Sequence, residues 1–416
     1  MVPTPSDESQ PVITESLKEA ASSSVHFSAK QTSSVHEIGA EKPPFGSRFL
    51  TNEADVWSQN AWDHVPPPDD QEETIARALE RQRLAPVPDD DKHKYNEKPA
   101  RHWDNFYKMN ASNFFKNRKW LHVEFPELVA AAQASAGPKT IVEVGCGAGN
   151  SAFPLLAENR NPELSMYAYD YSSHAVKLVQ NNPLYTSPPT GSIRSAVWDL
   201  SSLSLPTGLE PGSADIVVLV FVLSALHPRE WNRAVANIHK ILKPGGLLLF
   251  RDYGRHDLTQ LRFKTGRLLE DNLYVRGDKT RVYFFDADEL ARIFTGSAAP
   301  ASLVEHHTTT TTEPDASEEP SATPGPSSPI PEAAQLEQNP TDDAPPSALH
   351  TPSAPSPAPD TPPSPSPAPP TADDWPELVH PLFGIEQLGV DRRLIVNRKR
   401  QLKMYRVWMQ GKFRKL

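Results

Sequence analysis

A short glycine-rich segment marks a place where the backbone could approach a ligand. It reads Glu143-Val-Gly-Cys-Gly-Ala-Gly-Asn150, with glycines at Gly145, Gly147 and Gly149. Glycines at alternate positions allow a tight turn without clashes from Cβ atoms. The spacing departs from the Gly-x-Gly-x-x-Gly fingerprint that aims a helix N-terminus at a pyrophosphate. Glu143, just before the loop, would repel phosphate, so the segment suits a cofactor that carries positive charge.

Two further carboxylates end the next strand-like segments. Asp170 follows Tyr167-Ala-Tyr169, where it could accept both hydroxyl protons of a ribose, and Asp199 follows Val197-Trp198, where it could accept a hydrogen bond from an adenine amino group. One acid at a strand end is more often a helix cap or a solvated turn residue. Three acids at successive strand ends, beside a glycine loop, favour a nucleoside-binding site.

The elements that must position these residues alternate between strand and helix patterns. Strands are expected at 140–144, 166–169, 193–197, 216–223 and 247–250, and helices at 150–158, 173–181, 229–242 and 286–294. Ser173 and Asp286 are the expected N-caps of two of these helices. The alternation predicts an α/β fold with a mostly parallel, doubly wound sheet, in which ligands bind at the carboxyl ends of the strands.

Composition separates this α/β region from two other segments. The 416 residues include 44 prolines, with a mean hydropathy of −0.52 and a formal net charge of −10. Residues 297–374 hold 20 of the prolines and 12 acids without any Lys or Arg, and residues 1–40 are rich in Ser, Thr and Glu. We expect both segments to be disordered, because they bury too little apolar area to offset chain entropy. Residues 297–374 resemble an insertion, since ordered-looking sequence follows them; a linker between domains is the alternative.

Charge and cysteine content exclude several classes of protein. The longest apolar run, 214–226, is shorter than the roughly 20 residues that cross a bilayer. The first residues lack a signal-peptide core, and their acids argue against a transit peptide. The single cysteine, Cys146, permits neither an internal disulfide nor a cysteine zinc site, and we expect no metal. A cytoplasmic location fits best, with the nucleus as the alternative.

The glycine loop and the strand-end acids resemble those of the Rossmann-like class I S-adenosylmethionine-dependent methyltransferases. The resemblance implies S-adenosyl-L-methionine as cofactor. It also implies cofactor contacts from Glu143, Gly145, Gly147, Gly149, Asp170, Asp199, Leu200 and Val220. Many unrelated substrates share this scaffold, so the substrate must be read elsewhere in the chain.

Four further groups of motifs resemble one branch of that class, the transfer RNA N(3)-methylcytidine methyltransferases. They are 45–50 with 60–63, 103–108 with 113–118, 250–255, and 391–394 with 404–408. The resemblance covers nearly all of 45–296 and 382–416. It divides the chain into a tail (1–40), an extension that covers RNA and cofactor (41–130), a methyltransferase domain (131–296 and 375–416) and the acidic insertion (297–374).

Basic and aromatic residues suggest how RNA would be held. Aromatic side chains interleave with cations around 101–120, as suits the bases and phosphates of a single-stranded loop; packing of Phe106 and Phe114 on the core is the alternative. By the resemblance, Trp103 and Tyr107 cover the bound cofactor. The last 26 residues carry ten Lys or Arg and one acid, on two expected edge strands. The expected RNA-binding residues are Lys116, Arg118, Arg255, Arg392, Arg393, Arg398, Lys403 and Arg406.

Arg251, Asp252 and Tyr253 end the fifth strand, beside the expected methyl group, and are the candidate catalytic residues. The reacting ring nitrogen of cytidine has a lone pair and no proton, so transfer needs alignment more than a strong base. Asp252 would stabilise the positive charge that develops on the base. Tyr253 would stack on the base, and Arg251 would position a phosphate or carbonyl. The alternative for Asp252 is a simple ion pair with Arg251.

The sequence therefore predicts a tRNA (cytidine-N3-)-methyltransferase that acts in the anticodon loop, at position 32. The motif from Phe45 to Asp63 is most similar to the threonine-tRNA branch, with serine tRNA as the close alternative. A methyltransferase for protein or small molecules would not need the C-terminal cations, and an RNA- or cytoskeleton-binding scaffold would not need an intact cofactor loop. Beyond tRNA, an aminoacyl-tRNA synthetase or an accessory tRNA-binding protein is a possible partner.

Overall fold

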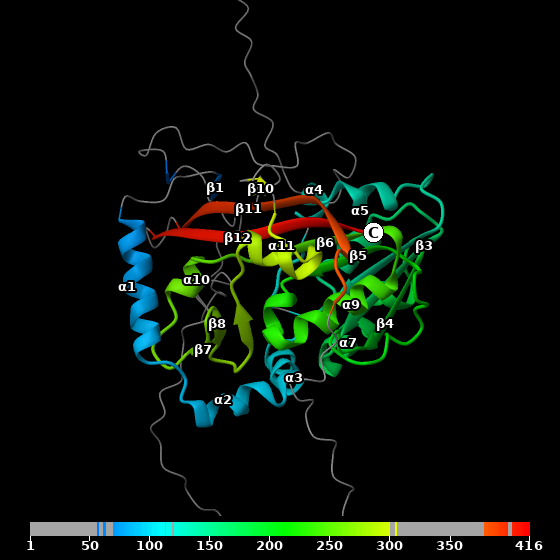
Figure 1. Ribbon diagram of the computed structural model, residues 1–416. Coiled ribbons are helices and arrows are strands. Elements are labelled where there is room, and N and C mark those ends of the chain that lie inside the picture. Colours follow the sequence, from blue (N-terminus) through cyan, green and yellow to red (C-terminus); the bar gives the residue numbers. More distant parts are fainter. Residues whose placement is uncertain are drawn as a thin grey trace, which may run out of the picture. The chain divides into compact units, whose positions relative to one another are not determined.

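A mixed sheet forms the centre of the computed structural model, which describes residues 56–57, 61–63, 70–112, 114–118, 120–299, 304–305, 378–397 and 402–416. In this part of the chain the sheet has nine strands, in the order β1-β11-β12-β6-β5-β2-β3-β4, with β10 paired to β11 (Figure 1). Their bounds are β1 Ala61–Asp63, β2 Lys139–Val144, β3 Leu164–Asp170, β4 Ser192–Val197, β5 Ala214–Val220, β6 Leu242–Tyr253, β10 Val304–Glu305, β11 Phe383–Asn397 and β12 Leu402–Lys415.

The five strands from β6 to β4 are parallel, as the alternation of patterns predicts. Successive residues of these strands pack into two different apolar cores, Val217 into one and Val218 into the other. The core that includes Val218 also contains residues of α5 (Pro126–Ala131), α6 (Ala152–Ala157) and α7 (Ser173–Gln180). The core that includes Val217 contains residues of α9 (Trp231–Ile241) and α11 (Ala287–Thr295). The doubly wound fold is therefore confirmed.

Most helix and strand positions agree with the sequence patterns to within a few residues. The Asp286 side chain accepts a hydrogen bond from the Glu289 amide, which confirms it as the N-cap of α11. The expected cap of α7 is wrong by one residue: Ser172, not Ser173, accepts from the Ala175 amide. Strand β6 covers Leu242–Tyr253 and so begins before the expected strand at 247–250.

The C-terminal strands form a long antiparallel hairpin that extends the sheet beside β6 (Figure 1). The expectation of two edge strands is wrong, because β12 lies between β11 and β6, and β11 itself pairs with β1 and β10. The register places Gln410 opposite Arg251, Met409 opposite Asp252 and Trp408 opposite Tyr253. The hairpin therefore borders the strand end that carries the candidate catalytic residues.

Most of the two segments expected to be disordered lies outside the part of the chain that the structure describes. Residues 1–40 and 306–374 lie outside the described residues. Val304 and Glu305 fall within the expected insertion, yet they pair in parallel with Leu388 and Gly389 of β11. The segment that interrupts the sequence thus contributes a short strand to the sheet.

A three-stranded antiparallel sheet and several helices lie around the central sheet. The small sheet comprises β7 Leu268–Glu270, β8 Leu273–Val275 and β9 Arg281–Tyr283. The remaining helical elements are α1 Gln71–Leu84, α2 Asp89–Asn96, α3 Pro99–Asn110, α4 Leu121–Glu124, α8 Pro183–Thr186, η3 Leu223–Ala225, η4 Pro228–Glu230 and α10 Leu258–Leu261. Within the described residues, every helix is too short or too polar to span a membrane.

Candidate functional site

A cavity opens at the carboxyl ends of the parallel strands. Its lining includes eight of the residues that the sequence assigned to cofactor binding or catalysis, namely Trp103, Tyr107, Gly145, Asp170, Asp199, Leu200, Val220 and Tyr253. They come from the extension before the sheet and from the ends of five neighbouring strands. The fold therefore brings together residues that are up to 150 positions apart in the sequence.

The glycine loop after β2 adopts backbone conformations that side chains disfavour. Gly145, Gly147 and Gly149 have φ values of +67°, +55° and +83°. A Cβ atom on Gly147 would lie 2.5 Å from the Tyr107 hydroxyl oxygen, and one on Gly145 would collide with the Val222 side chain. The loop thus forms a tight cradle that any larger residue would fill.

Asp170 fixes this loop to the end of β3. Its Oδ2 atom accepts a hydrogen bond of 2.9 Å from the Gly147 amide, and its Oδ1 atom accepts one of 2.8 Å from the Ser172 amide. Burial raises the pKa of Asp170 to about 6, against the two amides, which lower it. The carboxylate is therefore held rigidly where it lines the cavity.

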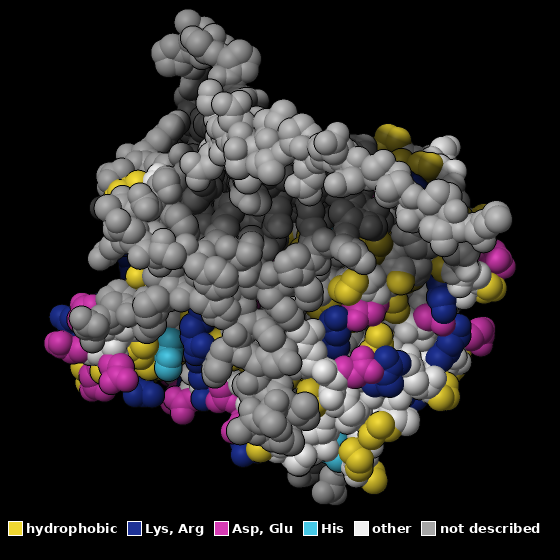
Figure 2. Space-filling model, turned by 90° about the horizontal axis from the view of Figure 1, so that it is seen from above, with side chains coloured by type: hydrophobic (Ala, Val, Ile, Leu, Met, Phe, Trp, Pro, Cys, Tyr) yellow, Lys and Arg dark blue, Asp and Glu magenta, His cyan; other side chains and the backbone are white. Residues whose placement is uncertain are grey.

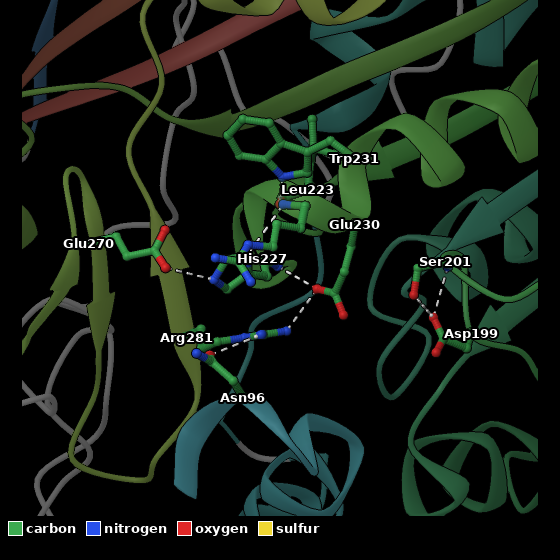
Figure 3. Close-up of polar contacts among 10 residues, drawn as sticks. Asn96, Asp199, Ser201, Leu223, His227, Glu230, Trp231, Glu270 and Arg281 are labelled. Atoms are coloured by element: carbon green, nitrogen blue, oxygen red, sulfur yellow. Dashed lines mark hydrogen bonds and ion pairs between the residues drawn. The ribbon is translucent and has the colours of Figure 1, made fainter. Parts of the chain in front are cut away.

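Asp199 and Leu200 follow β4 and also line the cavity. Asp199 is exposed, and its Oδ1 atom accepts hydrogen bonds of 2.8 Å from both the amide and the hydroxyl of Ser201 (Figure 3). Leu200 is buried beside it. A carboxylate and an apolar side chain together suit the amino group and the flat face of an adenine.

Glu143 lies in β2, two residues before Gly145, and is not among the residues that line the cavity. It is buried, and within the described residues neither of its carboxylate oxygens has a partner in good hydrogen-bonding geometry. Burial raises its pKa to about 7, although the Arg118 guanidinium, the Ser151 hydroxyl and the Ala152 amide draw it down. A buried carboxylate next to a glycine cradle, whose charge its neighbours only partly offset, fits a positively charged ligand. The residues present therefore fit S-adenosylmethionine.

Helix α3 and the segment after it cover the cavity. Five aromatic residues, Trp103, Phe106, Tyr107, Phe114 and Phe115, pack on one another with Ala175 of α7 and also line the cavity. The Asp104 carboxylate accepts hydrogen bonds from the Ser172 hydroxyl (2.7 Å) and the His174 amide (3.2 Å). The cover is therefore anchored to the start of α7. Phe106 and Phe114 pack in this cluster, as the packing alternative for them states, and both also line the cavity. Their stacking on RNA bases stays a prediction.

Asp252 is fully buried, and the structure does not place it in the cavity lining. Its Oδ2 atom accepts a hydrogen bond of 2.9 Å from the Ser224 amide and its Oδ1 atom one of 2.9 Å from the Tyr253 amide. Burial raises its pKa to about 6. Ser224 and Tyr253 do line the cavity. Asp252 thus lies behind two lining residues that it fixes by hydrogen bonds, and its expected role in stabilising charge on the base stays a prediction.

Arg251 is not available to position a phosphate or carbonyl. Its guanidinium bonds to the Gln410 and Asp391 side chains and lies 3.9 Å from a Glu124 carboxylate oxygen. It is sandwiched between the rings of Trp120 and Trp408, 5.0 and 4.9 Å from their centres. The alternative pairing of Asp252 with Arg251 is also wrong, since the partners of Arg251 lie on α4 and on the C-terminal hairpin.

The expected RNA-binding cations divide into two groups. Arg393 lies 3.5 Å from both Glu124 and Asp391, Arg406 lies 2.9 Å from Asp257, and Arg255 pairs with Asp286 and Glu289, so these three serve internal ion pairs. Lys116, Arg392 and Lys403 are exposed, and Arg118 lines the cavity. Arg398 lies outside the described residues. On the face that Figure 2 shows, cationic and acidic side chains lie interspersed.

Sequence reasoning missed one wall of the cavity. Glu230 precedes α9, and Arg276, Asp278, Thr280 and Arg281 belong to the turn between β8 and β9 and the start of β9. The only signal was an Arg-Gly-Asp-Lys turn between two short apolar runs at 273–275 and 282–285.

Ion pairs hold this wall in place. Arg281 donates to Glu230 (3.0 Å) and to Asn96 (3.3 Å), while the His227 ring lies 3.1 Å from Glu270 (Figure 3). His227 also caps the turn that begins η4. Burial lowers the pKa of His227, against the attraction of Glu270. This network joins α2, β7, β9 and η4 around one side of the cavity. Among the described residues, no group of three His, Cys, Asp or Glu side chains could hold a metal ion.

Comparison with known proteins gives consistent matches. Residues 117–297 match a family model described as a methyltransferase domain. A Saccharomyces cerevisiae protein named tRNA(Thr) (cytosine(32)-N(3))-methyltransferase is 41% identical over 379 residues, which cover 90% of this chain and 46% of that protein. The Schizosaccharomyces pombe tRNA N(3)-methylcytidine methyltransferase trm140 is 38% identical, with coverage of 93% and 97%. The Danio rerio tRNA N(3)-cytidine methyltransferase METTL2 is 39% identical, with coverage of 62% and 80%. The chain thus spans less than half of the S. cerevisiae relative and nearly all of the S. pombe one.

Proposed function

Since the chain belongs to the tRNA N(3)-methylcytidine methyltransferase family, we propose that it methylates N3 of a cytidine in the anticodon loop of a transfer RNA. One observation carries the proposal: seven of the residues that the sequence assigned to the cofactor line one cavity together with Tyr253 at the end of β6. The alignment with the S. pombe relative over 97% of its length supports the substrate class.

S-adenosylmethionine supplies an electrophilic methyl group on a sulfonium. The backbone of Gly145 to Gly149 would approach it closely, and Asp170 would accept hydrogen bonds from the ribose hydroxyls. Asp199 and Leu200 would hold the adenine, and Val220 would line the pocket. The buried Glu143 would offset the positive charge of the ligand. Trp103 and Tyr107 of α3 would exclude water from above.

Substrate alignment falls to the end of β6 and its neighbours. The N3 atom of cytidine has a free lone pair, so no residue needs to remove a proton. N3 is hidden in a base-paired stem, and the target must therefore be unpaired or flipped into the cavity. Tyr253 would offer an aromatic face to the base. Asp252 would fix Ser224 and Tyr253 and place a negative charge one layer behind the base, which becomes positively charged on methylation.

The finer assignments rest on the names of the relatives described above. We infer that position 32 of threonine tRNA is the target, because the S. cerevisiae relative carries that specificity in its name. Serine tRNA is the competing substrate. A tRNA-binding protein or a synthetase as partner, and a location in the cytoplasm or nucleus, are consistent with a tRNA substrate.

The test uses the full chain, isotopically labelled S-adenosylmethionine and purified threonine and serine tRNAs. We expect labelled 3-methylcytidine in threonine tRNA, and none in a variant that carries uridine at position 32. Label in serine tRNA alone would reassign the isoacceptor. Label in protein or small molecules, with none in either tRNA, would overturn the proposal.

A further inference from the structure

The turn between β8 and β9 forms the wall of the cavity beside Tyr253. Arg276, Asp278 and Thr280 of this turn line the cavity together with Tyr253 and Phe221. Tyr253 ends β6, whereas Asp170 ends β3 and Asp199 follows β4, on the other side of β5 and β2 in the strand order. The turn therefore faces the substrate end of the cavity rather than the cofactor end.

Arg276 is a buried cation with hydrogen-bonding capacity to spare. Its side chain is only 8% exposed, and its guanidinium carbon lies 5.5 Å from the centre of the Tyr253 ring. Its Nη1 atom makes two long contacts, of 3.5 Å to the Thr280 hydroxyl and 3.4 Å to the Arg281 carbonyl. Within the described residues, its Nε atom has no hydrogen-bond partner. Burying a cation with unfilled donors is costly, so an acceptor from a ligand is expected there.

Asp278 provides an acceptor on the same turn. Its Oδ1 atom accepts hydrogen bonds from the Thr280 amide (2.9 Å) and the Thr280 hydroxyl (2.6 Å). These bonds fix the carboxylate, which is half-buried at the cavity wall. The second oxygen of the carboxylate can accept from a ligand, so the turn presents a donor and an acceptor within three residues.

The turn is rigid before any substrate binds. The Arg276 amide donates to the Thr280 carbonyl (2.8 Å), and the Lys279 amide donates to the Arg276 carbonyl (3.0 Å). Arg281, at the end of the turn, is tied to Glu230 and Asn96 (Figure 3). A recognition surface that is already ordered loses little entropy on binding.

We propose that this turn reads the target base: Arg276 donates to the O2 carbonyl of cytosine, and Asp278 accepts from its N4 amino group. This inference rests on the proposed function. On the Watson–Crick edge of cytosine the reacting N3 lies between O2 and the amino group, so these two contacts leave N3 open to the methyl donor. Uracil carries a carbonyl in place of the amino group and would be repelled by the Asp278 carboxylate. The charge of Arg276 is partly offset by Asp252, with which it interacts electrostatically.

Atom-substituted tRNAs test both contacts with the full-length protein. The target position carries cytidine, 2-thiocytidine, whose sulfur is a poor acceptor, or pyrimidin-2-one, which lacks the amino group. Wild-type protein is compared with Arg276→Met and Asp278→Asn. We expect Arg276→Met to lower kcat/KM about tenfold or more on cytidine and pyrimidin-2-one, but little on 2-thiocytidine. Asp278→Asn should lower it on cytidine and 2-thiocytidine, but little on pyrimidin-2-one.

Ratios of variant to wild type on each substrate cancel the intrinsic reactivity of the altered bases. Lys279→Met, an exposed cation on the same turn, is the matched control and should leave all three ratios near one. Cofactor affinity, measured on each variant, separates impaired recognition from misfolding. If Arg276→Met or Asp278→Asn lowered kcat/KM equally on all three substrates, the inference would be overturned. Methylation of cytidine by the wild-type protein would still uphold the proposed function. A wild-type protein that modifies no cytidine-containing tRNA would overturn both.

Discussion

Glu143 shows how one buried side chain links proton binding to cofactor binding. Its pKa is raised to about 7 by burial, from an ordinary value of 4.5. The folded protein therefore binds this proton more tightly than the unfolded chain does. Between about pH 4.5 and 7 the unfolded chain has already lost the proton, so the free energy of unfolding falls as the pH rises through this range. A positively charged ligand favours the ionised form, so cofactor binding and deprotonation of Glu143 should reinforce each other.

We therefore predict that affinity for S-adenosylmethionine rises several-fold between pH 6 and pH 8. Glu143→Gln should remove most of this pH dependence and bind the cofactor more weakly at pH 8. Titration calorimetry across that range measures both effects. Wild-type and variant curves of the same shape would show that Glu143 does not sense the ligand charge.

Asp252 supports a second prediction at this scale. Asp252→Asn places an amide nitrogen against one of the two backbone amides that the carboxylate now accepts from, Ser224 or Tyr253. It also removes the buried negative charge. We expect methyl transfer to fall about tenfold or more in single-turnover assays, with cofactor affinity changed little. Unaltered transfer would remove Asp252 from the mechanism.

At the scale of residues, strand-end acids were predictable and ion-pair partners were not. Asp170 and Asp199 follow directly from the position of each strand, because parallel strands end at one edge. Arg251 was misjudged because its partner Asp391 lies 140 residues away in the sequence. Arg406 likewise pairs with the distant Asp257, and Arg393 pairs with the distant Glu124 as well as with Asp391, two positions away. Residue type and spacing reveal a cation, and only the fold reveals what neutralises it.

At the scale of elements, the C-terminal hairpin is part of the site's support. Trp408 of β12 contacts the guanidinium groups of Arg251, Arg393 and Arg406. Glu124 of α4 joins the same cluster, so α4, strand β6 and the hairpin meet there. The sequence predicted the strands of the parallel sheet because short strand-like segments alternate with helix-like ones along the chain. It did not predict the placement of β12, because pairing between distant strands leaves no local pattern.

The expected insertion at 297–374, which contains β10, can be shortened in two ways that differ in whether β10 is kept. Joining Gly296 directly to Asp374 would remove β10, which pairs with β11. Replacing only residues 306–374 by a flexible Gly/Ser linker of about twelve residues keeps β10 and shortens the loop, which lowers its closure entropy. We expect this shorter deletion to retain thermal stability and activity, and the longer one to unfold at a lower temperature.

Thermal unfolding and methyl-transfer assays on both deletions check this. A collapse in stability of the shorter deletion would mean that residues 306–374 contribute to the fold. Equal stability of the two would mean that β10 contributes nothing measurable.

At the scale of the whole molecule, charge is partitioned by position. The formal charge is −10, while ten of the last 26 residues are Lys or Arg. Part of that positive charge is neutralised by Glu124, Asp257 and Asp391. Arg392 and Lys403 are exposed and are the better candidates for binding phosphates.

Reversing both charges, by Arg392→Glu with Lys403→Glu, should weaken tRNA binding and reduce its salt slope by about one for each phosphate that the protein no longer neutralises. Arg393→Glu is the contrasting variant. It would place a third carboxylate beside Glu124 and Asp391, so it should lower thermal stability, as disruption of a buried ion pair does. Binding titrations over a series of salt concentrations give the slope. An unchanged slope in the double variant would place the RNA surface elsewhere.

The pairing of β12 with β6 also sets an order of events during synthesis. Strand β6 ends at Tyr253, and its neighbour β12 begins at Leu402. At usual translation rates, roughly 8 to 30 s separate the two on the ribosome. Until β12 arrives, the hydrogen-bonding edge of β6 has no strand to close it, and such edges promote association between chains. During this period the nascent chain contains all of β6 but exposes its unpaired edge. A chaperone that covers strand edges would be most useful then.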